Sequence, residues 1–156
     1  MTVHYRRATP DDAEQLVELR AVMIESMTGA PTSPDEPWWR AAVEWFREHL
    51  GGDEVVAFVA DDDGRLVAGA VGIRDRRPPR LANLTGWNGH VSSVATRPEA
   101  RRRGHARAVV ELLLTWFDEN GISQQDLSSS REAEELYLAL GFDDHPQRYL
   151  RRRTPG

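Results

Sequence analysis

Apolar residues in the first third of the chain recur at helical spacing. A short strand at Val3–Arg7 is followed by Thr9–Pro10, a hydroxyl and a proline that start a helix running to Gly29. A loop rich in proline comes next, and a second helix is predicted from about Glu36 to Leu50. This part of the chain therefore predicts one strand and two helices.

Short apolar runs and turns dominate the rest of the chain. A helix is predicted at about Arg103–Asn120 and a short one at about Arg131–Leu140. Further strands are predicted at Val55–Ala60, Leu66–Ile73, His90–Thr96, Ser123–Ser128 and Gln147–Arg152, the first two joined as a hairpin by Asp61–Gly64. This order predicts an α/β fold in which about four helices flank a central mixed sheet, with a parallel crossover in its second half.

Composition narrows the class of protein. With 156 residues, 40% of them hydrophobic, residues 1–156 are expected to form a single domain. The chain has no cysteine, which excludes disulfides, thiolate metal sites and a cysteine nucleophile, and its histidines lack metal-ligand spacing, so we expect no metal. No signal core and no run of about 18 apolar residues occurs, so we expect a cytoplasmic protein that binds no membrane.

An arginine-rich turn joins the strand at His90–Thr96 to the helix that follows it. The turn reads Arg101-Arg102-Arg103-Gly104-His105-Ala106-Arg107. A helix start carries unpaired backbone N–H groups, and Gly104 lets a ligand approach them, so the turn predicts a phosphate site. It lacks the lysine and second glycine of a P-loop and the three glycines of a dinucleotide fold. The alternative interpretation is a solvated helix start.

A net charge of -5 makes nucleic acid an unexpected partner for this turn. Nucleic-acid binding through Arg97–Arg107 is therefore the weakest of the functions considered.

A second motif lies in Ala133–Phe142, which contains Leu136-Tyr137 and Gly141-Phe142. Together the two motifs resemble the GNAT superfamily of acetyl-CoA-dependent N-acetyltransferases, which carry Gln/Arg-x-x-Gly-x-Gly/Ala followed by Leu-Tyr-x-x-x-Gly-Phe. The resemblance spans nearly the whole chain and is specific after residue 88. It implies the GNAT acyl-CoA N-acyltransferase fold and a single N-acetyltransferase domain. It also implies direct transfer of acetyl from acetyl-CoA to a primary amine of a small molecule or peptide. The alternative is a non-catalytic module that senses acetyl-CoA.

The resemblance assigns the acetyl-CoA site residue by residue. The backbone of Val94, Ala95 and Thr96 is expected to bind the thioester and pantetheine. The pyrophosphate is expected on the turn formed by Arg101, Arg102, Arg103, Gly104, His105, Ala106 and Arg107. The strand is expected to splay from its parallel neighbour at Ser123–Ser128, because the ligand's amides then satisfy the freed backbone groups. Ser130 stands where many members place an asparagine that touches pantetheine.

Two side chains are candidates for proton transfer. Tyr137 falls where many members place the acid that protonates the departing thiolate, and the alternative is an ordinary packing role. His90 falls where histone-type members carry a glutamate base, and a neutral histidine accepts a proton directly or through a water held by Ser92. The alternative for His90 is a strand-edge histidine that only hydrogen-bonds. Gln125 stands near the place where members that acetylate protein N-termini use a glutamate, which argues against that class.

In this superfamily the amine that receives the acetyl group is recognised by the early helices and the loop between them, here Met23–Trp39. Asp35 and Glu36 are candidates to attract an amine, and Trp38 and Trp39 to wall its site. The favoured alternative is that the acids match a helix dipole and the tryptophans belong to the core. Members often dimerise, so a homodimer is also expected.

Overall fold

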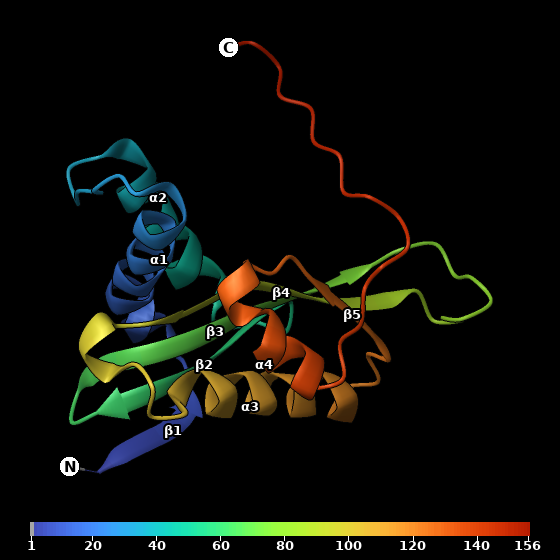
Figure 1. Cartoon of the computed structure of the whole chain (residues 1–156), viewed down its shortest axis with the longest axis horizontal. Coiled ribbons are helices and arrows are strands. Elements are labelled where there is room, and N and C mark those ends of the chain that lie inside the picture. Colours follow the sequence, from blue (N-terminus) through green and yellow to red (C-terminus); the bar gives the residue numbers. More distant parts are fainter. Residues whose placement is uncertain (1) are drawn as a thin grey trace.

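A single five-stranded sheet forms the centre of the protein. The computed structural model describes residues 2–156. The strands are β1 (Val3–Arg7), β2 (Val55–Asp62), β3 (Arg65–Arg76), β4 (Trp87–Thr96) and β5 (Gln124–Leu127), and they lie in the order β1-β2-β3-β4-β5 (Figure 1). All neighbouring pairs are antiparallel except β4 and β5, which are parallel. The predicted mixed sheet and parallel crossover are confirmed.

Helices cover both faces of this sheet. The 3₁₀ turn η1 (Pro10–Asp12) leads into α1 (Ala13–Thr28), which packs with α2 (Pro37–His49) on one face. The other face holds α3 (His105–Glu119), the crossover between β4 and β5. Two short 3₁₀ turns, η2 (Pro98–Ala100) and η3 (Arg131–Ala133), precede α3 and the short helix α4 (Glu134–Ala139). The layers are therefore helix, sheet, helix (Figure 1).

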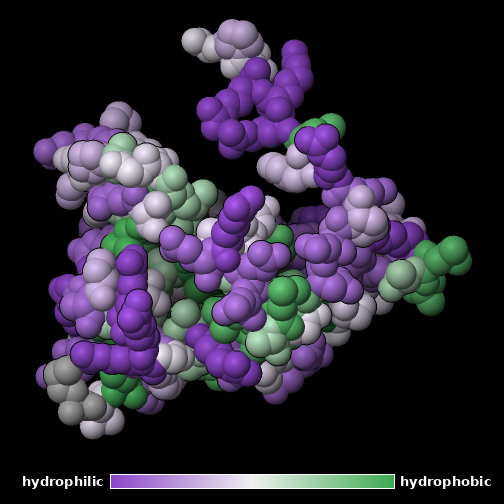
Figure 2. All heavy atoms as spheres, in the orientation of Figure 1, coloured by the Kyte–Doolittle hydropathy of each residue, from purple (hydrophilic) through white to green (hydrophobic). Residues whose placement is uncertain are grey.

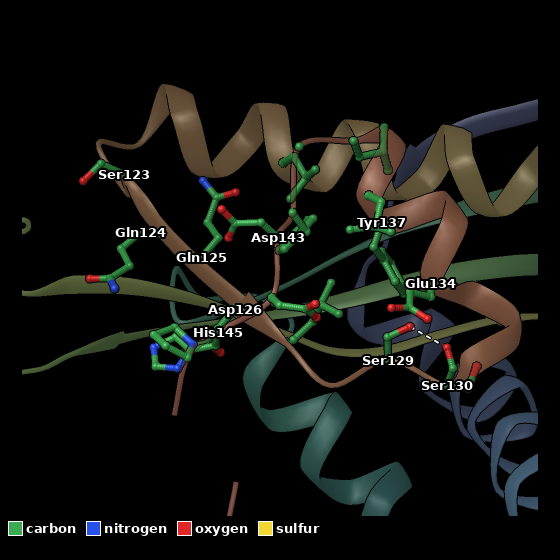
Figure 3. Close-up of a pocket in the computed structure, with 18 of the residues that line it drawn as sticks. Ser123, Gln124, Gln125, Asp126, Ser129, Ser130, Glu134, Tyr137, Asp143 and His145 are labelled. Atoms are coloured by element: carbon green, nitrogen blue, oxygen red, sulfur yellow. Dashed lines mark hydrogen bonds between the residues drawn. The ribbon is translucent and has the colours of Figure 1, made fainter. Parts of the chain in front are cut away.

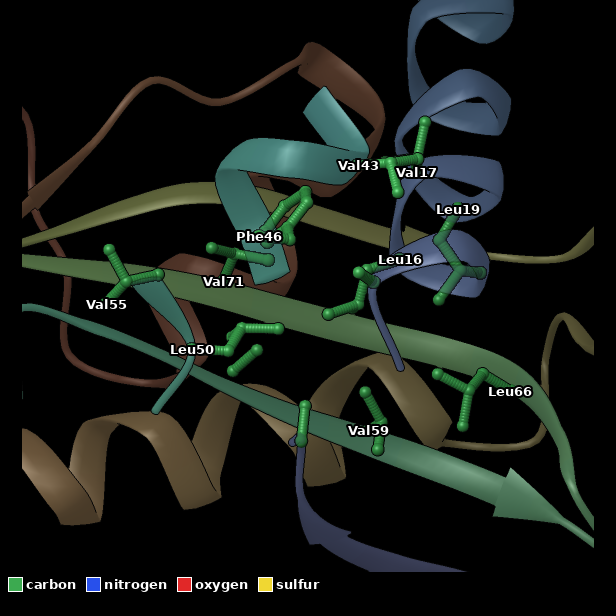
Figure 4. Close-up of a cluster of buried hydrophobic side chains, with 13 residues drawn as sticks. Leu16, Val17, Leu19, Val43, Phe46, Leu50, Val55, Val59, Leu66 and Val71 are labelled. Atoms are coloured by element: carbon green, nitrogen blue, oxygen red, sulfur yellow. The ribbon is translucent and has the colours of Figure 1, made fainter. Parts of the chain in front are cut away.

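Successive side chains of a strand point to opposite faces of the sheet, so the hydrophobic core has two parts. On β2, Val55, Ala57 and Val59 face α1 and α2 (Figure 4), whereas Val56 and Ala60 face α3. The continuous apolar run of this strand follows from its having helices on both sides.

Glycines on β3 and β4 let α3 lie close to the sheet. A Cβ on Gly72 would lie 2.6 Å from Leu113 Cδ1, and one on Gly89 would lie 2.9 Å from two ring carbons of Phe117. Side chains at these positions would displace α3, and with it the turn at which α3 begins.

The predicted strand at Gln147–Arg152 is wrong. After α4 the chain forms no helix or strand to residue 156, and its last segment runs away from the domain (Figure 1). Tyr149 and Leu150 are exposed. Their neighbours are mostly arginine, so a strand here would bury too little apolar surface to offset the cost of ordering it.

The connection between β3 and β4 also projects from the domain. Figure 2 shows a largely hydrophilic face with apolar spheres at the end of this connection, where Leu81 and Leu84 are exposed. These leucines therefore add nothing to either core.

Candidate active site

The site begins where β4 and β5 separate. The two strands pair from Asn88 with Gln124 to Val91 with Leu127, and no further. Beyond that point Ser93–Thr96 of β4 still pair with β3, but on the β5 side they have no strand partner within residues 2–156. A β-bulge at Ser92 marks the place. The predicted splay is confirmed, and it leaves backbone donors and acceptors free for a ligand.

A cavity of about 910 Å³ occupies this opening. Its walls come from α1, the end of β4, the arginine turn, the segment after β5 and α4. The residues assigned to acetyl-CoA that line it are Val94, Ala95, Thr96, Arg101, Arg102, Gly104, His105, Ala106, Arg107 and Ser130. Tyr137 also lines it, whereas Arg103 and His90 do not. The fold thus brings most of the predicted site residues to one cavity.

The arginine turn has a left-handed backbone at two residues. Gly104 has φ of +80°, is the N-cap of α3, and would direct a Cβ into open space. Arg102 has φ of +64°, which costs about 1 kcal/mol or more in a residue that carries a side chain. The turn thereby presents the free N–H groups at the start of α3 to the cavity.

The helix begins at His105, two residues later than the predicted Arg103. The His105 ring is buried, and its Nδ1 lies 2.8 Å from the Tyr5 hydroxyl on β1. This contact ties the turn to the far strand of the sheet.

Arg97 is separate from the exposed arginines of the turn. Its side chain is buried, donates to the Leu66 carbonyl at 2.7 Å and pairs with Glu18 at 2.6 Å. Arg97 therefore fixes the end of β4 to α1 and adds no charge to a basic surface.

Tyr137 lies on α4 between two cavities. Besides the opening described above, it lines a second cavity of about 810 Å³ bounded by α3, β5, α4 and the chain after α4 (Figure 3). Only 8% of the residue is exposed, and its ring packs edge-on against Phe142. Burial raises the pKa of Tyr137 above its ordinary value, so the hydroxyl keeps its proton at neutral pH. A protonated phenol at this place suits a proton donor.

His90 lies on β4 directly before the opening. Its neighbour Val91 belongs to the core under α3, so His90 faces the side covered by α1 and α2. The ring is partly exposed, and its Nδ1 lies 2.6 Å from Asp126 Oδ1 on β5. A histidine and a carboxylate in contact are a recurrent arrangement for proton transfer.

The residues predicted to bind the amine substrate already make contacts within the protein. The Glu36 carboxylate accepts from the Ser33 N–H at 2.6 Å and from Trp38 Nε1 at 3.1 Å. Trp38 and Trp39 pack against the core under α1 and α2. These contacts favour the structural interpretation of the loop over an amine site.

The sequence prediction missed Asp126. The residue lies opposite His90 in the parallel register, and its contact with the ring depends on that register. The separate prediction of strands at 90–96 and 123–128 did not specify their register, and no local signal singles out Asp126.

The protein is an α/β domain whose candidate site is the cavity at the point where β4 and β5 separate. The model of the Acetyltransferase (GNAT) family matches residues 17–142, and the chain belongs to this family. No curated protein matches the chain.

Solved structures share the fold over almost their full length. One is a predicted acetyltransferase from Clostridium acetobutylicum with acetyl-CoA, at 23% identity and TM-score 0.85, covering 97% of this chain and 96% of that one. Another is a GCN5-related N-acetyltransferase from Ralstonia eutropha, at 20% identity and TM-score 0.80, covering 97% and 99%. A third is an aminoglycoside N-acetyltransferase in complex with CoA, at 19% identity and TM-score 0.72, covering 98% and 97%.

Within residues 2–156 no helix is both long and apolar enough to cross a membrane. The same residues contain no group of three or more His, Asp or Glu side chains placed to hold a metal ion.

Proposed function

We propose that this protein transfers the acetyl group of acetyl-CoA to a primary amine of a small molecule. The observation that carries the proposal is the separation of β4 from β5 directly before the arginine turn. It provides free backbone groups for an amide-rich arm and an anion site for a pyrophosphate, in one continuous cavity.

Acetyl-CoA fits the residues that line this cavity. The backbone at Val94–Thr96 would bind pantetheine and polarise the thioester carbonyl. The N–H groups at Gly104–Arg107, with Arg101 and Arg102 beside them, would hold the pyrophosphate. Homologous folds have been solved with acetyl-CoA and with CoA, which supports the same cosubstrate here.

The proposed reaction is direct attack in a ternary complex. His90, directly or through a water, accepts a proton from the ammonium form of the substrate. The amine nitrogen then attacks the thioester carbon and gives up its second proton to solvent. The carbon–sulfur bond breaks, and Tyr137 protonates the departing thiolate and regains a proton from solvent. A phenol is a suitable donor to a thiolate, whose conjugate acid has a pKa of about 8.5 to 10.

A screen of amines for release of free CoA tests this function. The panel would include aminoglycosides, polyamines, amino acids and peptide N-termini, with mass spectrometry to find the acetylated product. We expect thiol release and an acetylated small amine. Calorimetric binding of acetyl-CoA, with no thiol released for any amine, would replace the enzyme with an acetyl-CoA sensor.

A further inference from the structure

Asp126 and His90 face each other across the parallel strands β5 and β4. The His90 Nδ1 and the Asp126 Oδ1 lie 2.6 Å apart, a distance typical of a hydrogen bond to an ionised acceptor. The other carboxylate oxygen accepts from Asn88 Nδ2 at 3.2 Å and lies 3.4 Å from Arg77 Nη1. Both oxygens of Asp126 are therefore held in place.

The ionisation of Asp126 decides which nitrogen of His90 carries the proton. Burial raises the pKa of Asp126, but hydrogen bonds from His90 and Asn88 outweigh burial and leave this pKa below its ordinary value. At neutral pH the group is a carboxylate, which only accepts hydrogen bonds. The proton of a neutral His90 ring must then lie on Nδ1, and the lone pair on Nε2.

Asn88 supplies a rigid support for this arrangement. It is 1% exposed and lies two residues before His90 on the same face of β4. Because its amide donates to Asp126 from a buried position, the carboxylate cannot rotate away from the ring without leaving a buried donor unpaired.

We propose that Asp126 is a positioning residue that holds His90 in the Nδ1–H tautomer and stabilises its protonated form. The inference rests on the proposed function, in which His90 is the base. An N–H bond of the ammonium substrate breaks and an Nε2–H bond forms, while Asp126 keeps its charge and its hydrogen bond. The proton later leaves His90 for solvent, and Tyr137 supplies the one taken up by the thiolate.

Three further charged or titratable groups are linked to Asp126. Arg77 lies 3.4 Å from its carboxylate, Asp75 pairs with Arg77, and His145 of the C-terminal segment lines the second cavity with Asp126 (Figure 3). Within residues 2–156, only Asp126 forms a hydrogen bond with the His90 ring. Replacing Asp126 by asparagine removes the negative charge that favours the imidazolium form, so proton transfer to His90 should become less favourable.

Nitrogen NMR of the free protein tests the tautomer without any substrate. The His90 ring signals are assigned by their disappearance in His90→Gln, and their shifts are read at a pH where the ring is neutral. We expect Nδ1 protonated and Nε2 unprotonated in the wild type, and a mixture of tautomers in Asp126→Asn. A wild-type ring protonated on Nε2 would overturn the inference.

Kinetics with the best amine from the screen provide the second test. We expect Asp126→Asn and Asp126→Ala each to lower kcat/KM by about 10-fold. An unchanged kcat/KM in both folded variants would contradict the role. If the amine screen fails while the Nδ1–H tautomer is present, the proposed function fails but the placement of the proton stands.

Two control variants separate general charge effects from the proposed role. Asp118→Asn makes the same chemical change on α3, where the carboxylate accepts from Gln125 on the other side of β5. His145→Gln removes the other imidazole that lines the second cavity with Asp126. Neither control should change the His90 tautomer or lower kcat/KM, and a tautomer mixture in either like that of Asp126→Asn would refute the assignment.

Discussion

Removing the hydroxyl of Tyr137 tests the assignment of the proton donor. In Tyr137→Phe the ring keeps its edge-on packing against Phe142, since only the oxygen is lost. Burial alone shifts the pKa of this hydroxyl, with no hydrogen bond from another residue among 2–156 contributing, so its loss leaves no partner unsatisfied. We therefore expect the free energy of unfolding to change by less than about 1 kcal/mol.

The catalytic effect should be much larger. A positioned acid contributes about 10²-fold or more, which corresponds to about 2.7 kcal/mol of transition-state stabilisation. The thiolate would then have to leave unprotonated or take its proton from water. We expect kcat to fall by about 10²-fold, whereas the Kd of acetyl-CoA changes by less than about threefold, because the hydroxyl acts on the sulfur only as the bond breaks.

The assay combines initial rates of CoA release with calorimetry of acetyl-CoA binding. Tyr149→Phe is the matched control, because it makes the same change on the exposed C-terminal segment. A kcat for Tyr137→Phe equal to that of the wild type would remove Tyr137 from the mechanism. A large rise in Kd at unchanged kcat would make it a binding residue instead.

Three further predictions concern the turn and the fold. Gly104→Ala should destabilise the protein by about 1 kcal/mol and weaken acetyl-CoA binding about 10-fold or more by calorimetry. Gly121→Ala, with φ of +72° and open space at its Cβ, should show only the stability cost. Asp12→Asn should lower the free energy of unfolding by about 1 to 2 kcal/mol at pH 7 in chemical denaturation, because it breaks the paired hydrogen bonds from Arg6 at 2.8 Å. Burial raises the pKa of Asp12, but hydrogen bonds from Arg6 and Thr9 bring this pKa below its ordinary value. The ionised Asp12 therefore stabilises the fold fully above about pH 4. The difference in stability between the two proteins should vanish as the pH falls through the lowered pKa of Asp12. Gly72→Ala should cost about 1 to 3 kcal/mol, because its Cβ would lie 2.6 Å from a leucine carbon on α3, and an unchanged melting temperature would contradict this packing.

The elements with strong local signals could be predicted from the sequence. The turn at Asp61–Gly64 has two aspartates and a glycine between apolar runs, and β2 and β3 form the hairpin that it predicts. The arginine turn lies between a strand and a helix, as predicted. Gly104 in this turn has the positive φ that glycine tolerates best. Both features depend on a few adjacent residues.

Features that depend on long-range contacts could not be predicted. The short hydrogen bond between His90 and Asp126 requires the register of β4 against β5. The two interpretations of Glu36 were separated only by its contacts with Ser33 and Trp38. The strand expected at Gln147–Arg152 failed for the opposite reason, since a local pattern without a tertiary partner does not secure a strand. The expectations of a homodimer and a cytoplasmic location stay predictions.

A crystal structure of the protein with acetyl-CoA would show where the cosubstrate binds. We expect the pantetheine arm between β4 and the segment after β5, hydrogen-bonded to the backbone of Val94–Thr96. We also expect the pyrophosphate on the N–H groups at Gly104–Arg107 and the thioester sulfur within reach of the Tyr137 hydroxyl. Acetyl-CoA bound in the second cavity beside α4, or elsewhere on the surface with the opening left empty, would contradict the proposed site.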